Sequence, residues 1–336
     1  MDPVTPRVTR AAVWTGDGVQ VRTFNLPNDS QDTLVRVRLA TVCGSDLHTL
    51  AGRRTAPCPS VLGHEAVGEV VVPGRHHRVA PGDRVIWSVT TACGRCARCM
   101  SGRTAKCETV RKVGHEPLDG DWPLSGSYAQ HIVLPAGATV EQVPDDLSDP
   151  VAAPAACATA TVMATLEAAG PVAGRRVLIC GAGMLGVTAA AACADAGADV
   201  QINDVDIARI KTASRFGGAC DAGGRIDVGI DFSGAAGAIS AALARLDVGG
   251  ILVLAGSVLP GRPLSFDPES VVRRWLTITG VHNYEPRHLA EAVKFLHTTR
   301  DKYPWADVVA EPVTLDALAS VLTPPPPGKL RASVRP

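Results

Sequence analysis

A glycine-rich turn between a short apolar strand and a long helix limits the possible folds more than any other segment. Residues 177–180 form the expected strand, Gly181-x-Gly183-x-x-Gly186 the turn, and an alanine-rich helix follows to about Ala196. Strand, turn and helix then alternate to about residue 285. This alternation predicts an α/β domain with a parallel, doubly wound sheet.

Glycines at this spacing let the backbone approach a pyrophosphate that lies at the N-terminus of the following helix. We therefore expect the turn to bind a dinucleotide. A glycine turn without any ligand is the alternative that the sequence leaves open. The candidate residues for this contact are Gly181, Gly183, Met184, Leu185 and Gly186.

Asp204 follows the next expected strand, residues 200–203. A carboxylate at this place would accept hydrogen bonds from the ribose hydroxyls and would repel a 2′-phosphate. The expected cofactor is therefore NAD rather than NADP. Arg209 is the nearby cofactor-binding candidate that would weaken this preference.

The sequence before about Leu134 has a different pattern. Residues 34–39 alternate apolar and polar side chains, and residues 66–72 and 84–87 are further expected strands. Many short strands with turns between them predict a β-rich, barrel-like domain. An alanine-rich helix is expected from about residue 151 to 169, and another from about 287 to 298 that returns to the first domain.

The balance of charge and hydropathy excludes some functions. Lys+Arg and Asp+Glu both number 33, so the basic surface typical of a nucleic-acid-binding protein is missing. No apolar run reaches about 20 residues, which argues against a membrane span. Residues 1–7 lack the regions of a signal peptide, so we expect a cytoplasmic protein with reduced thiols.

Four cysteines are spaced like the ligands of a structural zinc ion: Cys93, Cys96, Cys99 and Cys107. Four thiolates can surround zinc and leave no open position. Disulfides or free buried thiols are the alternatives. The other unassigned cysteines, Cys58, Cys180, Cys193 and Cys220, lack such spacing and are expected in the core or at the surface.

Residues 42–65 contain a second group of possible metal ligands. Cys43 precedes Ser45, Asp46 and His48, and His64 stands between Gly63 and Glu65. Cys43 and His64 suit a zinc ion with one open position, which is typical of catalysis. Spacing alone leaves open that both are ordinary core residues.

Together these motifs, in this order, resemble those of the zinc-dependent medium-chain alcohol dehydrogenases. The resemblance extends over essentially the whole chain and includes residues 231–234 and 249–256 as later strands of the cofactor domain. It implies a β-rich GroES-like catalytic domain, residues 1–155 and 287–336, with a structural-zinc lobe at about 90–110. Residues 156–286 would form a Rossmann domain.

The resemblance also implies an activity, which is hydride transfer between a small alcohol or carbonyl compound and NAD. Two zinc ions per chain are expected, one catalytic and one structural. The protein would be a homodimer or homotetramer, without nucleic-acid or membrane partners.

By the same resemblance, Cys157 is the third ligand of the catalytic zinc, beside Cys43 and His64. Glu65 would exchange with water as a ligand, and Asp46 would hydrogen-bond His64. Thr161 would lie near the nicotinamide. Ser45 and His48 would carry the alcohol proton to the surface through the cofactor ribose. Candidates for the substrate wall are Trp87, Val89, Trp122 and Tyr128.

Gly52-Arg53-Arg54 and Gly114-His115-Glu116 are similar to a bacterial subgroup associated with phosphonate metabolism. Arg53 and Arg54 would then bind an anion, unless they are simply solvated. Polyols and cyclitols are the competing substrates. A zinc-free quinone reductase and a non-catalytic protein of the same fold are the rival classes.

Overall fold

The computed structural model describes residues 6–27 and 31–336 of the 336-residue chain. The chain forms two compact units. The first extends to Cys157 and also contains Glu285–Arg300 and Trp305–Pro336, and the second contains Ala158–Tyr284 and Asp301–Pro304. Residues 1–5, on which the signal-peptide expectation partly depends, and residues 28–30 lie outside the described residues.

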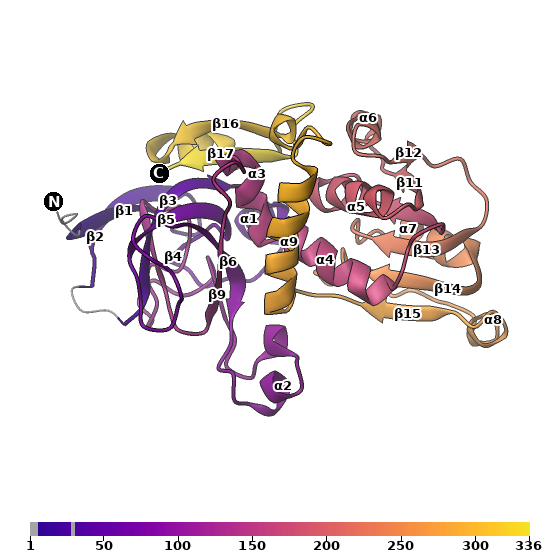
Figure 1. Ribbon diagram of the computed structural model, residues 1–336, viewed down its shortest axis with the longest axis horizontal. Helices are drawn as coiled ribbons and strands as arrows, with labels where there is room; N and C mark the ends of the chain where they lie inside the picture. The colour runs from indigo at the N-terminus through magenta and orange to yellow at the C-terminus, as the bar shows by residue number, and fades with distance from the viewer. Residues whose placement is uncertain (1–5, 28–30) are drawn as a thin grey trace. The chain divides into compact units, whose positions relative to one another are not determined.

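The first unit is rich in strands, as the alternating pattern predicts (Figure 1). Its largest sheet has the order β16-β17-β3-β5-β6-β7, with β8 on β3 and β9 on β6, and a smaller sheet has the order β2-β1-β4. The strands are β1 Val8–Trp14, β2 Val19–Asn25, β3 Thr33–Thr41, β4 Ser60–Val61, β5 Glu65–Val72, β6 Arg84–Thr91, β7 Arg111–Lys112, β8 His131–Leu134, β9 Ala138–Gln142, β16 Val309–Thr314 and β17 Arg331–Arg335.

Strand β3 shows why this unit folds as a curled sheet. Val35 and Val37 are buried in the core that also contains Trp87, while the alternate residues Arg36 and Arg38 point outward. Burial of apolar side chains stabilises the sheet by roughly 25 cal/mol per Å² removed from water. The ends of β3 and β5 are therefore held firmly where the chain leaves the sheet.

The helices of the first unit are short except for the last. They are α1 Gly44–Leu50, α2 Ala97–Met100, α3 Asp149–Ala152 and α9 Pro286–Thr299, with 3₁₀ turns η1 Thr104–Lys106, η2 Ala153–Ala156, η3 Trp305–Val308 and η4 Leu315–Val321. The helix predicted near residues 287–298 is confirmed as α9, which buries Leu289, Val293 and Leu296 at helical spacing.

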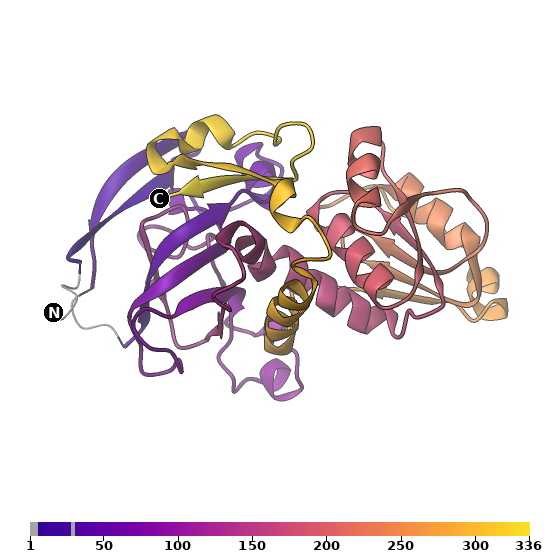
Figure 2. The same cartoon turned by 45° about the horizontal axis from the view of Figure 1, so that its top comes forward.

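The second unit is a doubly wound parallel sheet, as the strand–turn–helix alternation predicts. Its strand order is β12-β11-β10-β13-β14-β15, so β11 and β12 are added on one side of β10, and β13, β14 and β15 on the other. Figure 2 shows helices on both faces of this sheet. In such sheets ligands bind at the carboxyl ends of the two strands where the strand order changes side, here β10 and β13. The elements are α4 Ala158–Ala169, β10 Arg176–Cys180, α5 Met184–Asp195, β11 Asp199–Asn203, α6 Ile207–Ser214, β12 Ala219–Cys220, β13 Ile226–Asp231, α7 Ala236–Arg245, β14 Leu246–Leu254, α8 Pro268–Arg273 and β15 Thr277–Gly280.

The continuous helix expected over residues 151–169 is wrong. The segment is divided into α3, η2 and α4, and Cys157 lies at the break with φ −125° and ψ −64°. Pro154 contributes to the interruption, because proline has no N–H for the helical ladder. The break sets Cys157 apart from the helix that follows.

Candidate active site

Cys43 lies in the turn between β3 and α1. Its backbone is extended (φ −82°, ψ 153°), and its N–H donates to Asp46 Oδ2 at 3.0 Å. This bond caps the first turn of α1 and fixes the direction in which the Cys43 side chain leaves the helix. Cys43 is buried.

His64 and Glu65 lie where β5 begins, beside the end of β3. The antiparallel register pairs Thr41 with Glu65, which brings residues 64 and 65 next to Cys43. Gly63 precedes them with φ +93°, a left-handed conformation that favours glycine. Both side chains are buried, and Glu65 is 0% exposed.

The structure brings together Cys43, His64, Glu65 and Cys157, the four residues expected to hold the catalytic zinc. One ligand atom of each lies within 4.8 Å of the others. Both cysteines are free of disulfides. Two thiols, an imidazole and a carboxylate are the donors that zinc takes in proteins, so the residues fit this ion. We call these four residues the mixed cluster.

The two thiols of the mixed cluster have opposite tendencies to ionise. The hydrogen bond from Cys157 and the positive charge of Arg331 hold the pKa of Cys43 well below its usual value, against the effect of burial. The same hydrogen bond, together with burial, raises the pKa of Cys157 well above its usual value. Of the two thiols, Cys43 therefore loses its proton more readily, and the thiolate is the form that binds metal.

Arg331 is part of the site, and no motif in the sequence indicated this. Its guanidinium donates to both carboxylate oxygens of Glu65, at 2.7 and 2.8 Å, and its Nη2 lies 3.6 Å from Cys43 Sγ. Thr41 Oγ1 also donates to Glu65, at 2.7 Å. Burial nevertheless raises the pKa of Glu65 to about 7. Glu65 is thus held in a fixed place beside the other three residues of the mixed cluster.

Asp46 lies beside His64, the residue that it is expected to orient. Its Oδ1 lies 3.3 Å from His64 Nδ1, and its Oδ2 accepts from Tyr128 Oη at 2.9 Å. Burial alone would lower the pKa of His64, but Asp46 and Cys43 raise it well above its usual value. A carboxylate against Nδ1 orients the ring and leaves Nε2 for a metal.

Ser45 and His48, the expected proton-transfer residues, both lie on α1. Ser45 Oγ lies 3.2 Å from His64 Nε2. His48 Nδ1 is buried without a hydrogen-bond partner in the described part of the chain. Burial and the positive charge of Arg53 lower the pKa of His48. No hydrogen bond between the described atoms joins Ser45 directly to His48.

His115 is a second residue that the sequence did not assign to the site. Its ring centroid lies 5.5 Å from that of His64. Its Nδ1 contacts the carbonyl oxygen of Val113 at 2.8 Å, while its Nε2 is buried without a partner among the described atoms. Burial and the charge of His64 lower its pKa to about 4, so the ring is neutral near pH 7.

The aromatic residues considered for the substrate wall lie in the core instead. Trp87, Trp122 and Tyr128 are all less than 5% exposed. Trp122 Nε1 donates to the carbonyl oxygen of Val133 at 2.6 Å, and Tyr128 bonds Asp46. Tyr128 therefore acts on the site through Asp46.

The four cysteines of the lobe also converge. Cys93, Cys96, Cys99 and Cys107 have sulfur atoms within 4.8 Å of one another and form no disulfide. The N–H of Cys93 donates to Cys107 Sγ, at 3.3 Å. Burial alone would raise the pKa of Cys107, but hydrogen bonds from the Cys93 backbone and from the Thr109 side chain and backbone lower it to about 6. We call these residues the four-cysteine lobe, and they match a closed zinc site.

Glu285 fixes this lobe to the rest of the first unit. It is the N-cap residue of α9, and its carboxylate accepts from the N–H groups of Thr104 and Ala105 at 2.8 and 3.2 Å. The 3₁₀ turn η1 ends beside Cys107, so these bonds hold the lobe next to its last cysteine.

The predicted dinucleotide turn lies at the carboxyl end of β10, where the strand order of the second sheet changes side. Gly181 follows β10 with φ +100°, and a Cβ there would lie 3.1 Å from the Ser233 nitrogen just after β13. A Cβ on Gly186 would lie 1.8 Å from the Gly181 oxygen, whereas Gly183 faces open space. The turn therefore packs tightly on one side and leaves its backbone open at the N-terminus of α5, as a pyrophosphate requires.

The remaining cofactor candidates lie around this turn or in α4. Asp204 Oδ2 accepts from the Ala182 N–H at 2.6 Å, so the carboxylate is held against the turn. Arg209 is exposed and pairs with Asp206, with Nε 3.6 Å from Oδ2. Thr161 is half-buried in α4. The turn is continued by buried Met184 and half-buried Leu185, the first residues of α5.

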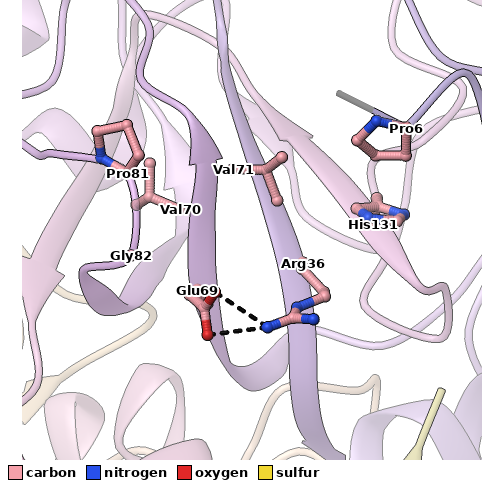
Figure 3. A pocket seen from close by; sticks show the side chains of 8 residues that line it. All are labelled: Pro6, Arg36, Glu69, Val70, Val71, Pro81, Gly82 and His131. Atoms are coloured by element: carbon pink, nitrogen blue, oxygen red, sulfur yellow. Dashed lines mark hydrogen bonds and ion pairs between the residues drawn. The ribbon is translucent and has the colours of Figure 1, made fainter. Parts of the chain in front are cut away.

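A surface pocket of about 500 Å³ lies elsewhere on the first unit, lined by residues that include Arg36, Glu69 and His131 (Figure 3). Arg36 donates to both oxygens of Glu69, each at 2.9 Å, so the two charges offset each other. No residue of either cysteine cluster lines the pocket, and we assign it no chemistry.

Among the described residues, no single helix is both long and apolar enough to cross a membrane. The bent pair Asp149–Ala156 and Ala158–Ala169 meets the limits of length and composition only when its two parts are taken together.

Comparisons with known proteins agree with this arrangement. The sequence profile of the alcohol dehydrogenase GroES-like domain matches residues 29–145. L-Threonine 3-dehydrogenase of Shewanella sp. strain ANA-3 is 32% identical, over 76% of this chain and 77% of the relative. Alcohol dehydrogenases of Thermotoga maritima (TM-score 0.89, 23% identity, 98% and 99% coverage) and Thermus sp. ATN1 (TM-score 0.86, 25% identity, 97% and 99% coverage) share the fold.

A GroES-like unit with a buried metal-ligand cluster, joined to a parallel nucleotide-binding type of sheet, is the architecture of a dehydrogenase. The chain belongs to the zinc-dependent medium-chain alcohol dehydrogenases, and it is an oxidoreductase. The predicted family and fold class are confirmed.

Proposed function

We propose that this protein transfers a hydride between an alcohol and NAD, with zinc held by the mixed cluster. The convergence of Cys43, His64, Glu65 and Cys157 within 4.8 Å carries this proposal. Residues 1–155 and 287–336 would be the catalytic domain, and residues 156–286 the cofactor domain. When bound, zinc supplies a Lewis acid that favours loss of the alcohol proton and polarises a carbonyl in the reverse direction.

The protein groups around the cluster have separate tasks. Asp46 orients His64. Arg331 bonds the carboxylate of Glu65, which would become a fourth ligand when it replaces water. Ser45 Oγ, beside His64, is the first acceptor of the substrate proton, and His48 releases it to solvent. The lowered pKa of His48 means that it is neutral near pH 7 and can accept a proton.

The four-cysteine lobe would hold the second zinc ion in a structural role. Four thiolates leave no position for substrate. Glu285 ties the lobe to α9, so the metal would stabilise this part of the first unit rather than take part in chemistry.

Asp204 supports NAD over NADP, because its carboxylate lies against the glycine turn and Arg209 is paired with Asp206. The Asp204→Ala variant is expected to use NADP better relative to NAD. An unchanged ratio of kcat/KM for the two cofactors would show that Asp204 has no such role.

The substrate is a small alcohol, and four classes compete. Polyols and cyclitols, phosphonate-bearing alcohols and, from the relatives at 32% identity, L-threonine are the candidates. Reduction of NAD measured across these alcohols, with zinc-quantified protein, tests the proposal. Absence of NAD reduction with every alcohol, in protein that carries two zinc ions per chain, would refute it.

We also propose a homodimer or homotetramer. Val272 and Trp275 are 71% and 79% exposed beside the edge strand β15. Exposed apolar side chains next to an unpaired strand edge are typical of a surface that a second chain covers. Light scattering that gives the mass of one chain at micromolar concentration would contradict this assembly.

A further inference from the structure

The turn Lys112–His115 lies directly against the mixed cluster. Gly114 has φ +72°, and a Cβ there would lie 2.5 Å from the oxygen of Gly63, the residue before His64. The N–H of His115 donates to the Lys112 carbonyl at 3.1 Å, which closes the turn. Because the His115 ring also faces the His64 ring, this turn forms one side of the candidate active site.

Two half-buried cations lie near this side of the site. Lys112 opens the turn, and Arg54 follows α1, where the Arg53 N–H donates to the His48 carbonyl oxygen at 3.0 Å. Burial and then the charge of Arg54 lower the pKa of Lys112, and Arg54 also lowers the pKa values of His115 and His48. Arg54 therefore acts on groups from both α1 and the turn that faces it. The two cations repel each other in a partly desolvated place, which costs free energy unless an anion is present.

No carboxylate of the described chain lies within ion-pairing distance of Arg54 or Lys112. Glu116 is nearby, but its carboxylate accepts from the backbone N–H of Lys112 at 2.7 Å. Other arginines of the first unit have acidic partners: Arg84 pairs with Asp149 at 2.6 Å, and the buried Arg331 with Glu65. Arg111, next to Lys112, instead lies over the Trp122 ring, 5.2 Å from its centroid. Among the described residues, Arg54 and Lys112 have no acidic partner of this kind.

His115 gives a second, independent indication of a ligand. A carbonyl oxygen only accepts, so the contact with Val113 requires the proton of His115 on Nδ1. Nε2 is then a hydrogen-bond acceptor, and it is buried without a donor among the described atoms. A buried unsatisfied acceptor costs free energy that a donor on a bound molecule would recover.

We propose that Arg54 and Lys112 bind an anionic group of the substrate, and that His115 Nε2 accepts a hydrogen bond from a hydroxyl or amino group of the same molecule. The substrate is then a small hydroxy compound with a carboxylate, phosphate or phosphonate group. Arg54 offers a planar fork for two oxygens, and Lys112 a point charge. Only the position of the reacting hydroxyl rests on the proposed function.

Inorganic phosphate is the probe for the anion subsite itself. Isothermal titration calorimetry is expected to show phosphate binding that weakens about 10- to 100-fold in Arg54→Gln and in Lys112→Gln, as loss of a charged hydrogen bond implies. Lys112→Arg keeps the charge and is expected to keep binding. Arg78→Gln, an exposed arginine outside the site, is the matched control and should bind as the original protein does.

Substrate pairs separate this inference from the proposed function. We expect kcat/KM for 3-hydroxypropanoate, 2-hydroxyethyl phosphate or 2-hydroxyethylphosphonate to exceed that for 1-propanol, and Lys112→Gln to reduce the preference about tenfold or more. Phosphate binding without oxidation of any alcohol would support the subsite and refute the dehydrogenase proposal. Oxidation of 1-propanol in preference to all three anions, without phosphate binding, would overturn the subsite and leave the dehydrogenase proposal intact.

Discussion

In both cysteine-containing clusters the candidate ligand atoms lie within 4.8 Å of one another, yet the two clusters draw their residues from the chain in different ways. The four-cysteine lobe takes all its ligand atoms from residues 93–107, and the mixed cluster takes them from residues 43–157. The lobe has only sulfur donors, whereas the mixed cluster adds an imidazole and a carboxylate. The candidate ligands of the lobe thus come from one short segment, whereas those of the mixed cluster come from several elements.

The surroundings of the two clusters differ as much as their ligands. Around the mixed cluster Asp46, Tyr128 and Arg331 are buried side chains that each bond a ligand or its neighbour. The lobe is supported mainly by backbone N–H groups that donate to sulfur. We infer that the mixed cluster is tuned for reactivity and that the lobe is built for stability.

The largest effect is expected from Cys43→Ser, which removes one of the two sulfur donors of the mixed cluster. Loss of several kcal/mol of metal assistance corresponds to a fall in activity of about a thousandfold. Zinc content is expected to fall from two ions per chain to one, measured by plasma emission spectrometry. Cys58→Ser, at an exposed cysteine outside both clusters, is the control, and unchanged zinc in the Cys43 variant would refute the assignment.

Next in size is Arg331→Met, which leaves Glu65 buried without its ion-pair partner. The free energy of unfolding is expected to fall by about 3–5 kcal/mol at pH 8. The pKa of Glu65 in the folded protein, about 7, exceeds the value of about 4.3 in unfolded chains, so its protonation favours the folded state at low pH. Stability contributed by this group is lost as pH rises from about 4.3 to 7, and the deficit of the variant should shrink at pH 5.

The double variant Glu65→Gln/Arg331→Met tests the cause of that deficit. Removal of both charges is expected to restore part of the lost stability, measured by urea denaturation. If the double variant is as unstable as the sum of the two single variants, the ion pair does not explain the effect.

A smaller effect is expected from Asp46→Asn. An amide orients His64 less well than a carboxylate does, and the zinc affinity of the mixed cluster should fall about 10- to 100-fold. Competition with a chelator of known affinity measures this change, and the lobe zinc should be retained. Equal weakening of both zinc ions would show that the effect of Asp46 is global.

The smallest effect on turnover is expected from Cys107→Ser. This variant should lose the lobe zinc and melt at a lower temperature, because metal binding there contributes to folding. The kcat of the remaining folded, zinc-containing protein should change little. A loss of turnover as large as that of Cys43→Ser would end the distinction between the two clusters.

The same difference explains how much of each region could be predicted from the sequence. The lobe and the glycine turn were predictable because their residues lie close together along the chain and have a fixed spacing. Cys157 was inferred only from the family resemblance, and the break in the helix at this residue was not predicted. The roles of Arg331 and His115 could not be predicted, because their contacts join segments far apart in the sequence.

The bond between Arg331 and Glu65 has a consequence for synthesis of the chain. Its two residues are 266 positions apart, and the whole second unit is made between them. The second unit can therefore fold before Arg331, the ion-pair partner of Glu65, has been synthesised. In ribosome-bound chains that stop before residue 331, we expect proteases to cut the first unit readily and to spare the second.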